Sequence, residues 1–168
     1  MKLLASVLVS LVLSACSTVH ASADYDRSRD FSRFHTWAWG PSGGASSPQV
    51  EEEIRNVIDA QLHKKGLVRV DGAADLEVRY RATHGETTLV QEWGTSYGPR
   101  WSGLTPYTHS HPALVGSLVV EVFEESSKEL AWRGTGTGEF PVNATDQDRA
   151  RTIDRGAARM FAHFPTGR

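Results

Sequence analysis

Apolar residues recur at helical spacing in two segments of the chain. In residues 48–65 they form one stripe: Val50, Ile54, Val57, Ile58 and Leu62. Ser47 stands at the N-cap position, Pro48 suits the first helical residue, and Gly66 supplies the C-terminal stop. The pattern predicts an amphipathic helix over residues 48–65.

The second helical pattern covers residues 146–164. Its apolar face is made of Ala150, Ile153, Ala157, Met160, Phe161 and Phe164. Thr145 and Asp148 have the spacing of a capping box, and Pro165 ends the segment. Gly156 lies in its middle and weakens a helix by about 1 kcal/mol relative to alanine.

Strand patterns lie between the two helices. Residues 76–83 alternate strictly, with Glu77, Arg79 and Arg81 on the polar face, and a longer strand that continues through residues 87–91 stays open. Residues 116–124 are apolar on much of both faces, and residues 129–140 return after a polar turn, which predicts a hairpin. Two further strands are predicted at residues 36–39 and 67–70, and Trp37, Trp39 and Trp132 are expected in the core.

This order of elements predicts an α+β fold. A mainly antiparallel sheet needs one face covered, and two amphipathic helices on one face can cover it. We therefore expect a two-layer sandwich, formed by a single domain over residues 24–168.

The N-terminus has the pattern of a targeting segment. Lys2 precedes a mostly apolar run over residues 3–13, which is shorter than the ~20 residues of a membrane-spanning helix and fits a secretory signal. The run ends in Leu13-Ser14-Ala15-Cys16, which resembles the lipobox of bacterial lipoproteins. The alternative is an ordinary secretory signal with a chance cysteine.

The lipobox resemblance implies a signal peptide over residues 1–15, a lipid on Cys16, and a tether over residues 16–23. Because residue 17 is serine rather than the aspartate that retains lipoproteins in the inner membrane, the resemblance implies the outer membrane. We expect the periplasmic face of that membrane, with several acyl chains giving a stable anchor.

Composition narrows the possible partners. Cys16 is the only cysteine, so no disulfide can form within one chain. The formal net charge is −2 and no basic cluster is present, so a nucleic-acid partner is not expected.

Residues 92–112 lose all periodicity and predict a long irregular loop, a kind of segment that is often functional. The loop carries four aromatic residues that form the candidate binding site: Trp93, Tyr97, Trp101 and Tyr107. Such rings can stack on a glycan or insert into a protein partner, or they can fold back onto the sheet.

Three patterns could carry chemistry, and each has a simpler interpretation. Residues 94–98 match the nucleophile-elbow pattern around Ser96, but Pro99 follows where that pattern needs a helix. Gly134, Gly136 and Gly138 could be a phosphate loop, but no helix opens after them, which favours small residues beneath a packed helix.

The histidines are the third pattern. His84, His109 and His111 could approach one metal, but no convincing fourth ligand accompanies them, so neither a metal nor a cofactor is expected. An enzyme would most simply be a hydrolase that uses Ser96 with His84, His109 or His163.

Several stretches together resemble the bacterial lipoproteins that share domain of unknown function 4136. They are Asp30 to Trp39, Ala74 to Tyr80, Gly116 to Gly134, and the C-terminal helix that runs into Phe164-Pro165. The resemblance implies an envelope lipoprotein with an α+β domain, and it supplies no catalytic or binding residues.

The sequence therefore predicts a non-enzymatic lipoprotein that binds or scaffolds an envelope protein or a glycan. Two alternatives stay open: the hydrolase, and a carrier of a glycan or small ligand that uses the aromatic loop.

Overall fold

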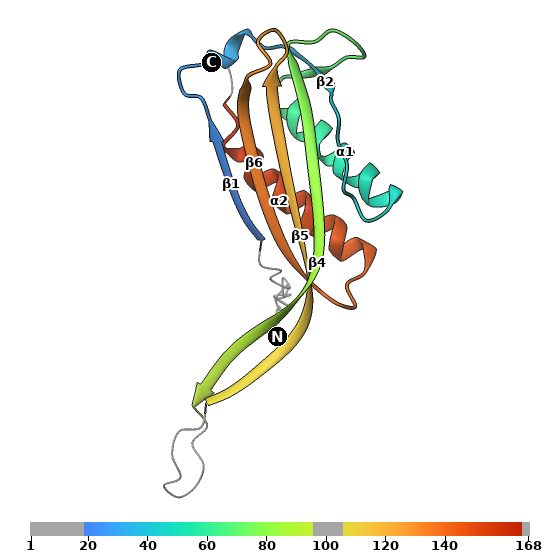
Figure 1. Ribbon diagram of the computed structural model, residues 1–168, viewed down its shortest axis with the longest axis vertical. Helices are drawn as coiled ribbons and strands as arrows, with labels where there is room; N and C mark the ends of the chain where they lie inside the picture. The colour runs from blue at the N-terminus through green and yellow to red at the C-terminus, as the bar shows by residue number, and fades with distance from the viewer. Residues whose placement is uncertain (1–18, 96–105, 166–168) are drawn as a thin grey trace, which may run out of the picture.

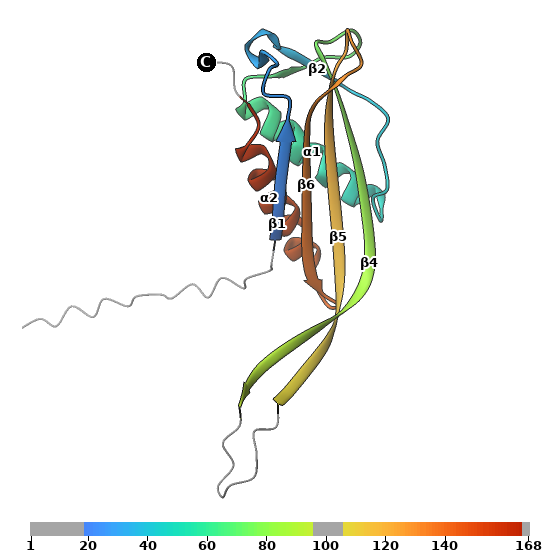
Figure 2. The same cartoon turned by 60° about the vertical axis from the view of Figure 1, so that its left-hand side comes forward.

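The protein folds as one six-stranded sheet with two helices packed on one face (Figures 1 and 2). The computed structural model describes residues 19–95 and 106–165. Its elements are β1 (Val19–Tyr25), the short 3-10 helix η1 (Phe31–Arg33), β2 (Thr36–Trp39), α1 (Pro48–Lys64), β3 (Val68–Arg69), β4 (Leu76–Thr95), β5 (Pro106–Glu124), β6 (Leu130–Pro141) and α2 (Asp146–Ala162). The predicted α+β sandwich is confirmed.

The strands lie in the order β1-β6-β5-β4-β2-β3. The pairs β1–β6, β6–β5 and β5–β4 are antiparallel, whereas β2 is parallel to both β3 and β4. The sheet is thus mainly antiparallel with a parallel edge. The predicted β5–β6 hairpin is present.

Both helices begin at the residues that the sequence indicates. The Ser47 hydroxyl accepts a hydrogen bond from the Val50 N–H, with Pro48 in the first turn of α1. At α2, Thr145 and Asp148 form the full capping box. The side-chain oxygens of these caps satisfy N–H groups that have no partner within the helix.

The core lies between the helices and the inner face of the sheet. Trp37, Trp132, Ile58 and Phe161 are among its fully buried residues. Gly134 allows the Trp132 ring to lie along β6, because a Cβ at Gly134 would come within 2.3 Å of that ring. Trp37 and Trp132 are in the core as predicted, and Trp39 is partly buried against it.

The expected tether over residues 16–23 is wrong for its second half. Val19–Tyr25 is strand β1, paired with β6 from Val19 opposite Gly138 to Tyr25 opposite Trp132. Ala21 and Ala23 pack against the core, and Arg159 of α2 donates a hydrogen bond to the Val19 carbonyl. The small polar sequence forms a strand because the glycine-rich β6 offers it a close neighbour.

The expected irregular loop over residues 92–112 is also wrong at both ends. β4 continues to Thr95, and β5 begins at Pro106. Within residues 19–95 and 106–165, neither helix has the length and apolar content needed to cross a membrane.

Candidate functional site

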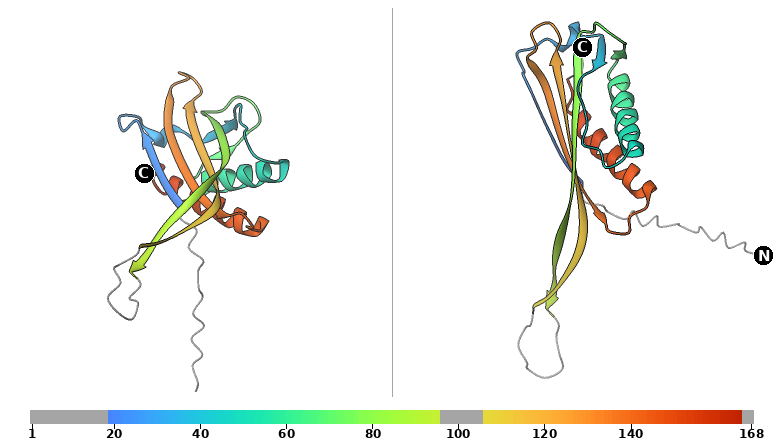
Figure 3. Two further views of the ribbon diagram at one scale, coloured as in Figure 1. Left: turned by 60° about the horizontal axis from the view of Figure 1, so that its bottom comes forward. Right: turned by 45° about the vertical axis from the view of Figure 1, so that its right-hand side comes forward.

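The two longest strands form an arm that projects from the body of the domain (Figures 1 and 3). β5 is paired with β6 only as far as Ala113, which is opposite both Pro141 and Thr87. Beyond that level, residues 88–95 and 106–112 pair only with each other. We call this two-stranded segment the arm; eight residues of strand extend it by roughly 25 Å.

Two of the four candidate aromatic residues lie on the arm. Trp93 and Tyr107 are register partners on β4 and β5. Tyr97 and Trp101, with Ser96 of the nucleophile-elbow pattern, lie outside the described residues. The structure thus brings Trp93 and Tyr107 together along the backbone near the end of the arm.

The candidate histidines are spread along the same ribbon. His84 is opposite Gly116 at the base of the arm, whereas His111 is opposite Leu89. The five residue steps from His84 to Leu89 correspond to roughly 16 Å along the strand. The part of the chain with described side chains contains no group of three or more His, Cys, Asp or Glu that could hold a metal ion.

A cavity opens between the sheet and the helices at the base of the arm. Its volume is about 110 Å³, and its lining includes Ile54 of α1, with Ile153 and Met160 of α2. Gly136 and Gly138 of β6 form part of its floor.

Helix packing explains Gly136 and Gly138 of β6, as predicted, whereas Gly134 makes room for the Trp132 ring of its own strand. A Cβ at Gly136 would lie 3.4 Å from the Met160 sulfur, and one at Gly138 would lie 2.7 Å from the Thr152 methyl carbon. Their lack of side chains lets α2 approach the sheet and leaves the cavity open beside it. The cavity was not predicted from the sequence, where the alternating glycines of β6 are a local signal of it.

One charged side chain lines this cavity. Arg149, in the first turn of α2, has a side chain that is 32% exposed and pairs with Asp146. Its Nε atom is buried and has no hydrogen-bond partner. The remaining polar contributors are hydroxyls and His84.

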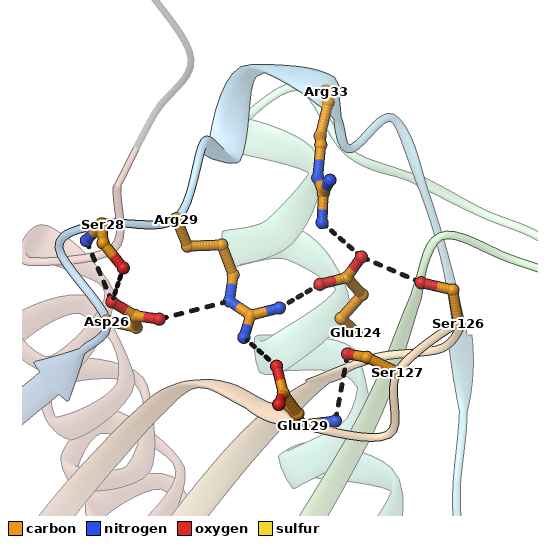
Figure 4. A network of polar contacts seen from close by, with 8 residues as sticks. All are labelled: Asp26, Ser28, Arg29, Arg33, Glu124, Ser126, Ser127 and Glu129. Atoms are coloured by element: carbon orange, nitrogen blue, oxygen red, sulfur yellow. Dashed lines mark hydrogen bonds and ion pairs between the residues drawn. The ribbon is translucent and has the colours of Figure 1, made fainter.

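A network of ion pairs lies at the opposite end of the domain (Figure 4). Glu124, at the end of β5, is 8% exposed and accepts hydrogen bonds from both Arg29 and Arg33. Arg29 also donates to Glu129 at 2.9 Å, and the Ser126 hydroxyl donates to Glu124 at 2.9 Å.

The network stabilises the fold rather than forming a reactive site. The hydrogen bond from Ser126 and the positive charges of Arg33 and Arg29 lower the pKa of Glu124. Glu124 therefore stays ionised at neutral pH. Arg29 and Arg33 both lie in the segment around η1, and both bind Glu124. These charged hydrogen bonds therefore hold that segment against the β5–β6 turn.

The predicted polar face of β4 is the outer face of the sheet. Arg79 donates to Glu77 and lies 4.5 Å from the centre of the Phe123 ring. Its hydrogen bond is the largest cause of the lowered pKa of Glu77, with Lys128 adding to it. Arg81 is exposed. These contacts describe a solvated face of paired charges.

The fold and its projecting arm define an α+β domain of a family whose function is not known. Residues 21–166 match the family described as Domain of unknown function (DUF4136), so the chain belongs to that family. This confirms the resemblance seen in the sequence. A comparison with curated proteins finds no match.

Solved structures share the fold at low sequence identity. The PelC dodecamer from Paraburkholderia phytofirmans is similar at 13% identity and a TM-score of 0.50, over 88% of this chain and 96% of that chain. A PDZ domain protein from Parabacteroides distasonis is similar at 14% identity and a TM-score of 0.51, over 90% of this chain and 37% of that chain.

A minor lipoprotein from Acinetobacter baumannii is also similar, at 9% identity and a TM-score of 0.40, over 77% of this chain and 91% of that chain. The first two likenesses show the fold alone.

Proposed function

We propose that the protein is a lipid-anchored component of the bacterial envelope that binds a partner through the arm and catalyses no reaction. The observation that carries this proposal is the arm itself, because residues 88–95 and 106–112 pair only with each other. A two-stranded ribbon on its own is marginally stable in water. Its free edges also present unpaired N–H and C=O groups. Packing against a partner would stabilise the ribbon and would give these N–H and C=O groups hydrogen-bond partners.

The partner we propose is another envelope protein, since strand edges bind extended backbone directly. A glycan stacked on the aromatic residues is the alternative. Trp93 and Tyr107 are register partners and so offer two neighbouring aromatic positions on the arm.

The geometry of β1 supports the anchor. Only Ser17 and Thr18 separate Cys16 from Val19, so the Cys16 Cα lies at most ~11 Å from the Val19 Cα. Val19 is opposite Gly138, which is in line with Gly116 and His84 across the sheet. A lipid on Cys16 would therefore hold the base of the arm close to the membrane. For this anchor we propose the outer membrane, because residue 17 is serine rather than aspartate, and on that membrane we propose the periplasmic face.

A non-catalytic role is supported by the positions of the ionisable groups. Glu124 is held by arginines, and Asp148 belongs to the cap of α2. Asp75 accepts hydrogen bonds from the N–H groups of His35 and Thr36. Each of these carboxylates has a structural partner that accounts for its position.

Site-specific photocross-linking in living cells tests the proposal. A photoreactive phenylalanine is placed at Thr88 or Gln91 on the arm, and at Glu52, which is exposed on α1, as the control. We expect a discrete adduct with one envelope protein from the arm positions and none from Glu52. Equal adducts from all three positions, or none from the arm, would contradict the proposal.

A further inference from the structure

We propose that the cavity at the base of the arm binds one acyl chain of an anionic single-chain amphiphile, such as a fatty acid, taken from the membrane. The chain would enter the cavity, and the acidic group would stay at Arg149. This inference goes beyond the proposed function; it does not depend on the arm, and it takes from the proposed function only the anchor at Cys16, which brings the cavity to a membrane.

The lining of the cavity selects an apolar occupant. Ile54, Ile153, Ala157 and Met160 cover it from the helices, and Gly136 and Gly138 expose carbon on the sheet side. Apolar cavities in other proteins take up hydrocarbon. Moving one methylene group from water into such a site improves affinity about fourfold.

The size of the cavity selects part of a chain rather than a bulky ligand. Its volume is about 110 Å³, against about 150 Å³ for an engineered cavity in another protein that binds benzene. Ligands of drug size need at least ~300 Å³. The terminal carbons of an acyl chain fit inside. Because the cavity is open to solvent, the rest of the acyl chain can extend out of it.

Arg149 selects the charge of the occupant. Its buried Nε lacks a partner, and its pairing with Asp146 involves a carboxylate that is 91% exposed. A guanidinium offers several N–H donors in a fixed plane that matches carboxylate and phosphate groups. An anionic head group can therefore pair with the exposed part of the guanidinium while its chain lies on the apolar lining.

The positive charge of Arg149 also distinguishes between the possible sources of the bound acyl chain. Acyl groups bound to a lipidated cysteine are uncharged esters and amides, so a chain from Cys16 would leave Arg149 without an anion. An apolar protein side chain in the cavity would likewise leave Arg149 without an anion. Val19 lines the cavity, which places it at the end of the domain nearest Cys16. A lipid of the surrounding membrane is thus within reach.

Photolabelling of the full-length protein in phosphatidylcholine vesicles tests the inference. The vesicles contain a diazirine derivative of palmitate or, in parallel, of the uncharged hexadecanol. After irradiation, labelled peptides are mapped by mass spectrometry. We expect palmitate label on β6 near Gly136 and on α2 near Met160.

Matched variants show whether the label reports the cavity. Ala82→Leu and Ala45→Leu each add carbon to its lining and should lower labelling of these peptides at least fivefold. Gly85→Leu is the control, because nothing lies within 4 Å of a Cβ at Gly85. Circular dichroism establishes that each variant is folded. If only one of the two filling variants folds, that variant alone tests the inference.

A second pair of variants tests the head group. Arg149→Gln should lower palmitate labelling at least threefold and leave hexadecanol labelling unchanged. Arg151→Gln is the control, since Arg151 lies outside the cavity and also pairs with a carboxylate three residues away.

Three results would overturn the inference. The first is labelling that neither filling variant reduces. The second is equal labelling by palmitate and hexadecanol that is insensitive to Arg149→Gln. The third is labelling that appears only in a Cys16→Ser protein. That result would mean that the lipid on Cys16 fills the cavity in the unaltered protein.

Discussion

The indole of Trp132 on β6 packs against the ring of Phe161 on α2, with 4.9 Å between their centres. Both residues are fully buried, and Phe164 lies 5.2 Å from Trp132 on the same centroid measure. This contact joins the C-terminal helix to the middle of the sheet. It is one of the contacts in the buried core that hold the two layers together without a disulfide.

Phe161→Ala should therefore lower the free energy of unfolding by about 3–5 kcal/mol, because it removes a buried ring and leaves a cavity. Urea denaturation measures the change. Asp154→Ala, at an exposed position of the same helix, should change it by less than about 0.5 kcal/mol. A loss below about 0.5 kcal/mol for Phe161→Ala would contradict the observed packing.

Gly156→Ala should stabilise the protein by about 0.5–1 kcal/mol, because alanine favours the helix. A Cβ at Gly156 would lie 3.7 Å from the nearest Val19 carbon, which is an ordinary contact. Gly134→Ala should instead destabilise it, because the new Cβ would meet the Trp132 ring at 2.3 Å. Thermal melts of the two variants should shift in opposite directions; a shift in the same direction would be inconsistent with these contacts.

Stability should fall in acid between about pH 4 and pH 2. Hydrogen bonds from the Thr145 side chain and from Arg151 lower the pKa of Asp148 to about 2, and hydrogen bonds from the backbone of His35 and Thr36 lower that of Asp75. A lowered carboxyl pKa contributes stability above the unfolded-state pKa, and that stability is lost as the pH falls through the folded-state value.

The melting temperature measured from pH 7 to pH 2 checks this expectation. It should be nearly constant above pH 5, and Asp148→Asn should reduce the decline below pH 4. An unchanged acid profile in that variant would show that the cap of α2 does not contribute to it.

Cys16→Ser should abolish metabolic labelling with palmitate and leave the signal uncut by the lipoprotein peptidase. In the proposed anchor the Cys16 sulfur receives the lipid, and serine has no sulfur at that position. Palmitate incorporation into the serine variant, followed by fractionation, checks the expectation. Label retained by that variant would exclude Cys16 as the anchor.

Caps and periodic apolar faces made the helices predictable from the sequence. Ser47 and the pair Thr145 and Asp148 mark their starts, and the stripes face the core as expected. The alternation of β4 near Tyr80 was equally clear because one face is buried and the other is wet.

β1 and the outer part of the arm escaped prediction for physical reasons. The inward positions of β1 include Ala21 and Ala23, which are too small to give an apolar alternation. The arm extends beyond the body of the domain, so the packing of the two layers does not impose a two-residue period on its sequence. The cavity depends on how closely α2 approaches β6, a distance that local sequence does not determine.

The central claim is that the arm is the binding element and the rest of the domain is its support. Replacing residues 88–112 by Asn-Gly joins Thr87 to Ala113, which are register partners, through a two-residue hairpin turn. The arm pairs only with itself, so the shortened protein should unfold within about 1 kcal/mol of the parent. The decisive measurement is recovery of the cross-linked envelope partner with the shortened protein, using formaldehyde on whole cells. We predict that recovery falls to background while the protein stays folded and anchored; undiminished recovery would contradict the account.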